Sequence, residues 1–79
     1  MKLIILQPEG TLFNGDIESV TLPGEKGSFT LLKRHAPLIS ILAKGIIKYR
    51  IKNSQAYETI GVNGGFVKIR NDSITICTD

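Results

Sequence analysis

The sequence predicts an all-β fold, a flattened antiparallel β-sandwich or barrel. Glycine, proline and asparagine recur every few residues and divide the chain into short segments. No interval between them offers ten or more residues with the apolar spacing of an amphipathic helix. Several segments instead alternate apolar and polar side chains, as strands with one buried face do. Short strands without helices pack as a sandwich or a barrel.

The clearest strand signal lies in residues 46–52. Ile47, Tyr49 and Ile51 fall on one side of an extended chain, and the intervening residues are all basic. This period of two is typical of a half-buried strand. We therefore expect a strand with an apolar inner face and a solvated, basic outer face.

A hairpin is predicted near the end of the chain. Val67 and Ile69 alternate with basic residues, and Ile74 and Ile76 alternate with hydroxyl residues. Between these two runs stand Asn71 and Asp72, which favour turns. Further strands are expected at 2–7, 11–13, 16–22, 28–32, 37–42 and 56–62, so about eight strands occupy a single domain, residues 1–79, without repeats or linkers.

Composition excludes several classes of protein. The 79 residues are 42% hydrophobic and 22% charged, which indicates one small folded core rather than disorder. The net charge of +3 is scattered, and the only cysteine, Cys77, leaves no internal disulfide, so a reducing compartment is the simpler expectation. The longest apolar run, residues 3–6, is too short for a membrane helix or a signal peptide. We expect a soluble, non-secreted chain.

The sequence offers little for catalysis. His35 is the only histidine, and the carboxylates show no metal-ligand spacing, so no metal site is expected. Sequence alone leaves a pairing of Cys77 with His35 open, but Cys77 stands in a regular strand pattern, where a small buried thiol is the ordinary interpretation. No Gly-Lys-Ser/Thr follows the glycines, so a phosphate-binding loop is not predicted.

Binding to nucleic acid is the main alternative that the residues suggest. Lys48, Arg50 and Lys52 on one face of a small basic barrel can follow a phosphate backbone. Such sheets normally add stacking aromatic residues, whereas Tyr49 alternates onto the apolar face and Phe66 stands alone. A solvated outer face is therefore favoured. A sandwich that binds carbohydrate or another ligand is a third possibility, which the few aromatic residues argue against.

Four segments resemble the ε subunit of bacterial F-type ATP synthases, in the family's order over nearly the whole chain. The first is the opening 3–15 with its Pro-Glu-Gly, Phe and Gly; the second is Val20, Leu22, Pro23, Gly24, Gly27 and Phe29. The third and most distinctive is His35, Ala36, Pro37 and Leu38. The fourth is Gly64, Gly65, Phe66 and Val67, followed by Asn71, Ile74, Thr75 and Ile76. Each motif alone is weak, but four in order are a specific signal.

The resemblance implies a sandwich of about ten short strands and a non-catalytic subunit of the central stalk that needs no cofactor. It implies a link between the γ subunit and the c-ring that supports the coupling of proton flow to ATP synthesis. The γ-subunit interface is expected at Leu12, Phe13, Ser40, Ile41 and Asn63. The c-ring contact is expected at Gly27, Ser28, Arg34 and His35, from one end of the sandwich.

The resemblance also implies a peripheral location at the cytoplasmic face of the bacterial inner membrane, within the complex. No nucleic acid and no independent homo-oligomer are expected as partners. Ser28 departs from relatives that carry a carboxylate there, and Lys33 and Arg34 can supply a basic contribution instead. The family's C-terminal helical hairpin is absent from this sequence, so inhibition of ATP hydrolysis by such a hairpin is not expected of these residues.

Overall fold

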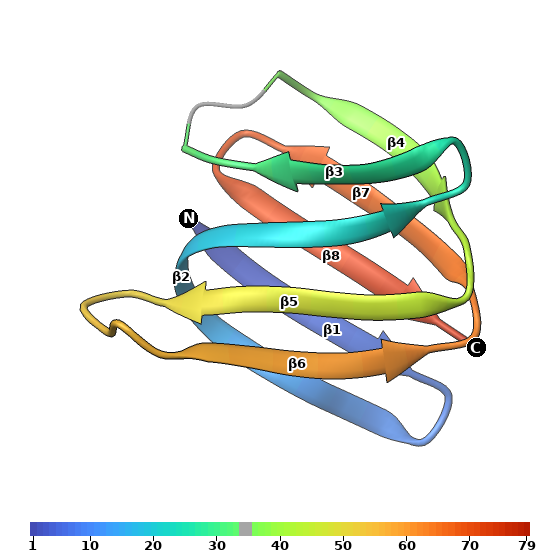
Figure 1. Ribbon diagram of the computed structural model, residues 1–79, viewed down its shortest axis with the longest axis horizontal. Helices are drawn as coiled ribbons and strands as arrows, with labels where there is room; N and C mark the ends of the chain where they lie inside the picture. Colours follow the sequence, from blue (N-terminus) through green and yellow to red (C-terminus); the bar gives the residue numbers. More distant parts are fainter. Residues whose placement is uncertain (34–35) are drawn as a thin grey trace.

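The computed structural model describes residues 1–33 and 36–79. Every regular element in this part of the chain is a strand (Figure 1). The eight strands are β1 (Lys2–Gln7), β2 (Gly10–Gly24), β3 (Gly27–Leu31), β4 (Leu38–Leu42), β5 (Gly45–Ile51), β6 (Tyr57–Val62), β7 (Gly65–Arg70) and β8 (Ser73–Thr78). No described segment forms a helix long and apolar enough to cross a membrane.

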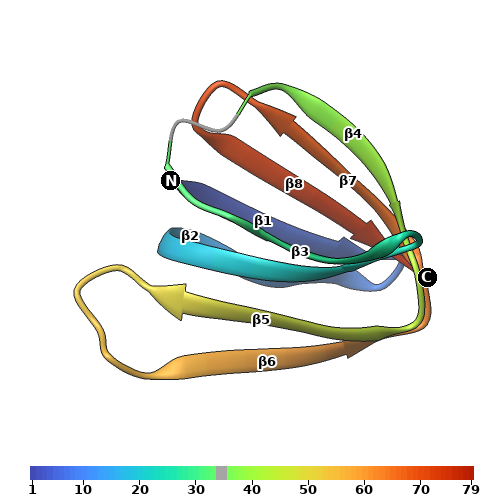
Figure 2. The same cartoon turned by 45° about the horizontal axis from the view of Figure 1, so that its top comes forward.

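The strands form two layers that share β2 (Figure 1 and Figure 2). One layer contains β4, β7, β8, β1 and the first half of β2, and the other contains β3, the second half of β2, β5 and β6. The change of layer follows Asp16, the last residue of β2 that pairs with β1. Pairing with β5 begins at Ile17 and shifts in register before Ser19. Such an irregularity bends a strand and increases its twist, which turns β2 from one layer into the other.

The core lies between the layers and is built by alternation. Ile47 and Tyr49 are buried, as are Val67, Ile69, Ile74 and Ile76, as the sequence pattern predicts. They join Met1, Leu3, Ile5, Ile17, Val20, Leu22, Leu31, Leu42 and Val62 in one apolar cluster. Each fully buried leucine or isoleucine contributes about 1.5–3 kcal/mol relative to an exposed one. No buried polar or charged residue is found among the described ones.

The all-β sandwich class is confirmed, with two differences in its strands. The expected strands 11–13 and 16–22 are one continuous strand of 15 residues, β2, because Asn14 and Gly15 pair with β1 instead of forming a turn. The described chain therefore has eight strands, close to the number that the residue pattern predicted and fewer than the ten or so that the resemblance implied. In addition, β1 and β8 pair in parallel, so the sheet is not wholly antiparallel.

The predicted turn between β7 and β8 is present, and asparagine supplies its geometry. Asn71 has a positive φ of 56°, a conformation that asparagine tolerates better than most residues. Gly65, at the start of β7, has a φ of +137°, and a Cβ there would overlap the carbonyl oxygen of Cys77 on β8. Only glycine therefore lets β7 and β8 approach at this point.

Gly65→Ala should lower the free energy of unfolding by about 2–4 kcal/mol, because it adds backbone strain to a steric overlap with β8. Gly61→Ala is the matched control, since a Cβ on Gly61 meets nothing within 4 Å. It should leave stability unchanged or raise it by up to about 1 kcal/mol. Urea unfolding curves of both variants measure the effect, and equal midpoints would contradict this account of Gly65.

Tyr49 anchors an aromatic pair at the margin of the core. Its ring lies 4.6 Å from that of Phe13, centroid to centroid, at an angle of 46°. Phe13 is partly buried and packs against the core cluster. Burial raises the pKa of the Tyr49 hydroxyl, and the negative charge of Glu58, its cross-strand partner, raises that pKa further. The folded chain therefore favours the neutral tyrosine.

This shift predicts a loss of stability at alkaline pH. The pKa of Tyr49 is higher in the folded than in the unfolded chain. The contribution of Tyr49 to the free energy of unfolding is therefore constant below the unfolded pKa of about 10 and falls above it. Tyr49→Phe should remove a decline of at most about 1.4 kcal/mol per pH unit. The measurement is the free energy of unfolding from pH 8 to 11. Tyr57→Phe, which retains Tyr49, should keep the decline; a Tyr49→Phe profile identical to the wild type would refute the assignment.

Candidate interaction surface

The first layer carries a row of apolar side chains on its outer face. Ile41 of β4 lies opposite Phe66 of β7, Phe66 lies opposite Cys77 of β8, and Cys77 lies opposite Leu6 of β1. Residues directly opposite each other in neighbouring strands share a face of the sheet. These four residues therefore form one line across four strands, which we call the outer apolar row. Ile41 is 54% exposed and Phe66 44% exposed.

The outer face changes in polarity along the strands. Two residues before Ile41 on β4, Ile39 lies opposite Lys68 of β7, and Lys68 lies opposite Thr75 of β8. At the far end, Arg70 lies opposite Ser73, and Ser73 lies opposite Lys2. The face thus runs from apolar, through mixed, to charged. The apolar part is confined to the end that holds the turn between β2 and β3 (Figure 1).

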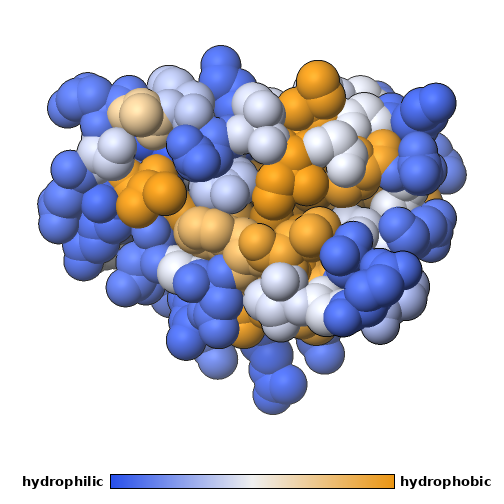
Figure 3. Space-filling model, turned by 90° about the horizontal axis from the view of Figure 1, so that it is seen from below, coloured by the Kyte–Doolittle hydropathy of each residue, from blue (hydrophilic) through white to orange (hydrophobic). Residues whose placement is uncertain are grey.

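Leu12 and Phe13 extend this apolar surface toward the second layer. Leu12 is 40% exposed and stands beside Thr11, the partner of Leu6, at a bulge between β1 and β2. Figure 3 views the molecule from the side of β6 and the β1–β2 hairpin, and shows apolar side chains in the middle of that face with hydrophilic ones around them. Three large apolar side chains in this region are at least partly accessible: Leu12 and Phe13 at the start of β2, and Ile60 on β6.

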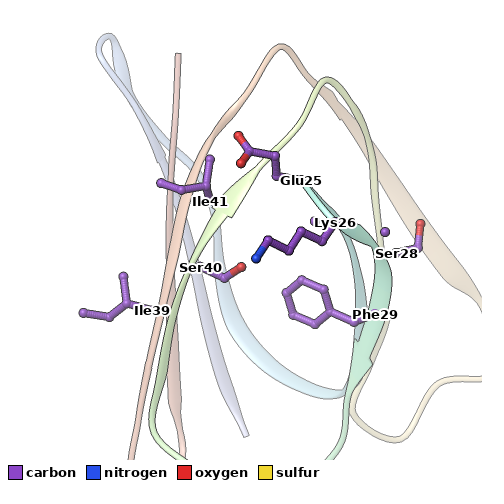
Figure 4. Close-up of a pocket in the computed structure, with 9 residues that line it drawn as sticks. Glu25, Lys26, Ser28, Phe29, Ile39, Ser40 and Ile41 are labelled. Atoms are coloured by element: carbon purple, nitrogen blue, oxygen red, sulfur yellow. The ribbon is translucent and has the colours of Figure 1, made fainter.

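A pocket of about 460 Å³ lies between β3 and β4 (Figure 4). It brings together four residues predicted for two different contacts: Gly27 and Ser28, assigned to the c-ring, with Ser40 and Ile41, assigned to γ. In Figure 4, Lys26 extends between Phe29 on one wall and Ser40 on the other. The two sets of predicted residues thus adjoin at this point of the fold.

The remaining predicted residues are more widely spread. Asn63 is exposed in the connection between β6 and β7. Leu12 and Phe13 lie on the strand at the opposite side of the layer from β4, four strand spacings or about 19 Å away by sheet geometry. The γ set is therefore not one compact cluster. The outer apolar row is what joins its two parts.

The c-ring set was expected to lie at one end of the sandwich, and β3 argues against that. Gly27 and Ser28 begin β3, and the segment that leads toward Arg34 and His35 leaves from the other end of this strand, after Leu31 (Figure 1). The two segments are thus separated by the length of β3. Arg34 and His35 themselves lie outside the described residues.

Sequence reasoning missed several residues of this surface. Phe66, Cys77 and Leu6 join the row only through strand register, which one sequence does not reveal. Phe66 had a usable signal, because it precedes the buried Val67 in an alternating strand and so must face outward. Ile39, 69% exposed on the same face of β4 as Ile41, was also missed, because Leu38 to Leu42 show no clear alternation of apolar and polar residues.

The outer face of the second layer is mostly polar and basic, apart from Ile46 of β5, which is 61% exposed. Thr30, Thr21, Lys48 and Thr59 lie opposite one another across four strands. The hydroxyl oxygens of Thr21 and Thr30 are 2.9 Å apart. Tyr57, opposite Arg50 and 53% exposed, adds an aromatic ring that the sequence reasoning did not consider, and the Lys48 ammonium lies 4.4 Å from its centroid.

No group of three or more His, Cys, Asp or Glu that could hold a metal occurs within residues 1–33 and 36–79. Cys77 is half-buried in the middle of the row. What the surface offers a partner is apolar area from branched and aromatic side chains, the composition found at the centres of protein interfaces.

Known proteins are similar over the whole of this chain. A family model described as the ATP synthase delta/epsilon chain, beta-sandwich domain, matches residues 1–79. The ATP synthase epsilon chain of Leptospira interrogans serovar copenhageni is 38% identical over 79 residues, which are all of this chain and 61% of that protein. The epsilon chain of Wolinella succinogenes is 42% identical over 79 residues and is covered to 60%. The chain thus spans about three-fifths of these relatives.

Solved structures show the same fold. A chain of the Tetrahymena thermophila mitochondrial ATP synthase, in a structure of its central stalk and c-ring, superposes with a TM-score of 0.82 at 17% identity. That match covers 99% of this chain and 62% of the other. A chain of the Euglena gracilis mitochondrial enzyme gives a TM-score of 0.86 at 18% identity, covering 96% and 48%. With the family model matched from end to end, the chain belongs to the ATP synthase delta/epsilon family and corresponds to its β-sandwich domain.

Proposed function

We propose that this chain is a non-catalytic adaptor of a rotary ATP synthase that connects the γ subunit to the c-ring, with residues 1–79 acting as one domain. Family membership supports an ATP synthase subunit. The observation that carries the adaptor role is the outer apolar row, in which the exposed Ile41 and Phe66 continue into the partly exposed Cys77 and Leu6 across four strands. Contiguous exposed apolar surface of this kind marks contact sites between proteins.

The outer apolar row is the proposed γ interface, together with Leu12 and Phe13 at one end. Ser40 adjoins the other end on the pocket side of β4. Ile41 and Phe66 are cross-strand neighbours, so one partner surface can bury both at once. Aromatic side chains at the centre of an interface contribute a large share of the binding energy. Asn63, in the turn before β7, supplies a polar position at the margin.

The proposed c-ring contact is the turn between β2 and β3, with Gly27 and Ser28. Both residues are exposed, and Gly27 has a φ of +125°, which fixes the shape of this tight turn. The family resemblance assigns Arg34 and His35 to the same contact. The turn itself carries one charge of each sign, on the exposed Glu25 and Lys26, which suits a polar loop as its partner.

The mechanism is mechanical. A rotor adaptor transmits torque only if it keeps its shape, and here backbone pairing in two layers and a closely packed core give the sandwich rigidity. The chain makes and breaks no bond; nucleotide chemistry and proton transfer belong to other subunits. Its place is peripheral, at the cytoplasmic face of the bacterial inner membrane, where coupling of proton flow to ATP synthesis requires γ and the ring to turn together.

Phe66→Asp and Ile41→Asp should each weaken binding to the γ subunit of the same organism about 30-fold, roughly 2 kcal/mol, because a carboxylate replaces buried apolar area. Thr59→Asp is the matched control, with the same new carboxylate at an exposed strand position of the other layer. Isothermal titration calorimetry measures the affinities. Equal affinities for all three variants would remove the outer apolar row as the γ interface.

One observation favours a second candidate, a nucleic-acid-binding module. Tyr57 lies on the same outer face as Lys48 and Arg50, which combines an exposed ring with two cations. Single-stranded nucleic acid is bound by such combinations. The test is retention on single-stranded DNA or RNA at rising salt, because phosphate contacts give a steep logarithmic loss of affinity. Strong, salt-sensitive retention that Tyr57→Ala and Lys48→Ala abolish would support this candidate over the adaptor.

A further inference from the structure

The two layers are not closed between β3 and β4. Here the layers are joined at one end only, where Gly24 of β2 pairs with Leu42 of β4. From there β3 and β4 diverge, and neither pairs with the other (Figure 2). The pocket of about 460 Å³ occupies this opening and falls within the usual range of binding pockets.

The backbone of β4 presents unpaired groups to the opening. The carbonyl of Ile41 accepts a bond from the amide of Glu25, and the amide of Ala43 donates to the carbonyl of Pro23. Odd-numbered residues of β4 therefore direct their backbone groups away from β7 and toward the hairpin of β2 and β3, since strand residues alternate in direction. The amides of Ile39 and Ile41 and the carbonyl of Ile39 point the same way, and on that side the described strands pair with β4 only at Gly24–Leu42.

The edge of β3 is complementary. Pro23 directs its carbonyl away from β3, to Ala43, so Pro23 and its partner Ser28 are a pair that does not exchange hydrogen bonds. Because strand residues alternate, Thr30, two residues further along β3, also belongs to a pair that does not exchange hydrogen bonds with β2. The backbone groups of Ser28 and Thr30 thus face the opening from one side, as those of Ile39 and Ile41 do from the other. Two unpaired strand edges on either side of a gap are a template for an added strand.

The side chains around the opening define what such a strand must carry. Phe29 and Ser40 face each other across it, and the Lys26 side chain lies between them (Figure 4). Phe29 packs against the core, so it offers an apolar wall. Lys26 is exposed and directs its positive charge toward Ser40, whereas the carboxylate of Glu25, which also lines the pocket, points away from Ser40 (Figure 4). An apolar residue next to Phe29 and a carboxylate within reach of Lys26 satisfy both.

We propose that an extended segment of the γ subunit, carrying an apolar residue and a carboxylate, adds as a strand between β3 and β4. This inference rests on the proposed function. The occupant follows from continuity, because Ile41 belongs both to the outer apolar row and to the pocket, so the chain that covers the row reaches the opening directly. The added strand is parallel to one neighbour and antiparallel to the other, and its backbone bonds join β3 to β4. Main-chain pairing of this kind supplies affinity, and the flanking pockets supply specificity.

The test is hydrogen exchange of individual amides by NMR, in this chain alone and bound to γ. Strand addition should slow exchange at Ile39 and Ile41 at least about tenfold, because both amides gain partners. Ser40 and Leu42, which direct their amides toward β7, serve as internal references. If γ binds and the amides of Ile39 and Ile41 keep their free exchange rates, strand addition is refuted and the adaptor role stands. If γ does not bind at all, both proposals fall.

Two variants test the contacts separately. Ile39→Pro removes an amide that faces the open edge of β4 and not β7. The fold should tolerate this substitution, as edge strands tolerate proline. It should weaken γ binding about fivefold, whereas Ile39→Val, which keeps the donor, should not. Lys26→Glu should weaken binding, and the same reversal at Lys44, in the connection between β4 and β5, should not. Unchanged affinity for both Ile39→Pro and Lys26→Glu, with native circular dichroism, would overturn the proposal.

Discussion

The fold depends on one strand that belongs to both layers. The first half of β2 pairs with β1, and the second half pairs with β3 and β5. Ile17, where the strand changes layer, is fully buried, and its amide bonds the carbonyl of Met1 at 2.8 Å. This arrangement sets the angle between the layers, and with it the volume of the core and the position of every surface described above. A break in β2 at this point would leave two small sheets, neither able to bury its apolar face alone.

The alternation of apolar and polar residues made much of the fold predictable. The pairing of strands that are far apart in the sequence could not be predicted. The strands at 46–52 and the hairpin around Asn71 follow from local patterns, so they could be read directly. The continuity of β2 could not, because Asn14 and Gly15 are ordinary turn residues that here are held extended by pairing with β1. The parallel pairing of β1 with β8 is likewise invisible in either segment, since parallel and antiparallel edge strands share the same alternation.

The candidate surface was predictable to a lesser degree. The family resemblance indicated Ile41 and Ser40, and the structure shows Ile41 to be exposed beside Phe66. Neither composition nor periodicity showed that Leu6, Cys77 and Phe66 stand in line with it, because that depends on the registers of three strand pairs. The separation of Gly27 from the segment after Leu31 was missed for a related reason. Because the two segments are close in the sequence, we expected both at one end of the sandwich. The strand between them, β3, places them at opposite ends.

The parallel pairing of the first and last strands also bears on how the chain folds. Lys2 pairs with Ser73 and Leu6 with Cys77, so β1 and β8 are joined by contacts that span almost the full sequence. During synthesis β1 can pair with β2 early, but its other edge stays open until β8 has left the ribosome. Structures dominated by such non-local contacts close late and cooperatively, typically in milliseconds to seconds. The nascent chain thus exposes an unpaired apolar edge until β8 emerges, and during that interval this edge can pair with another copy.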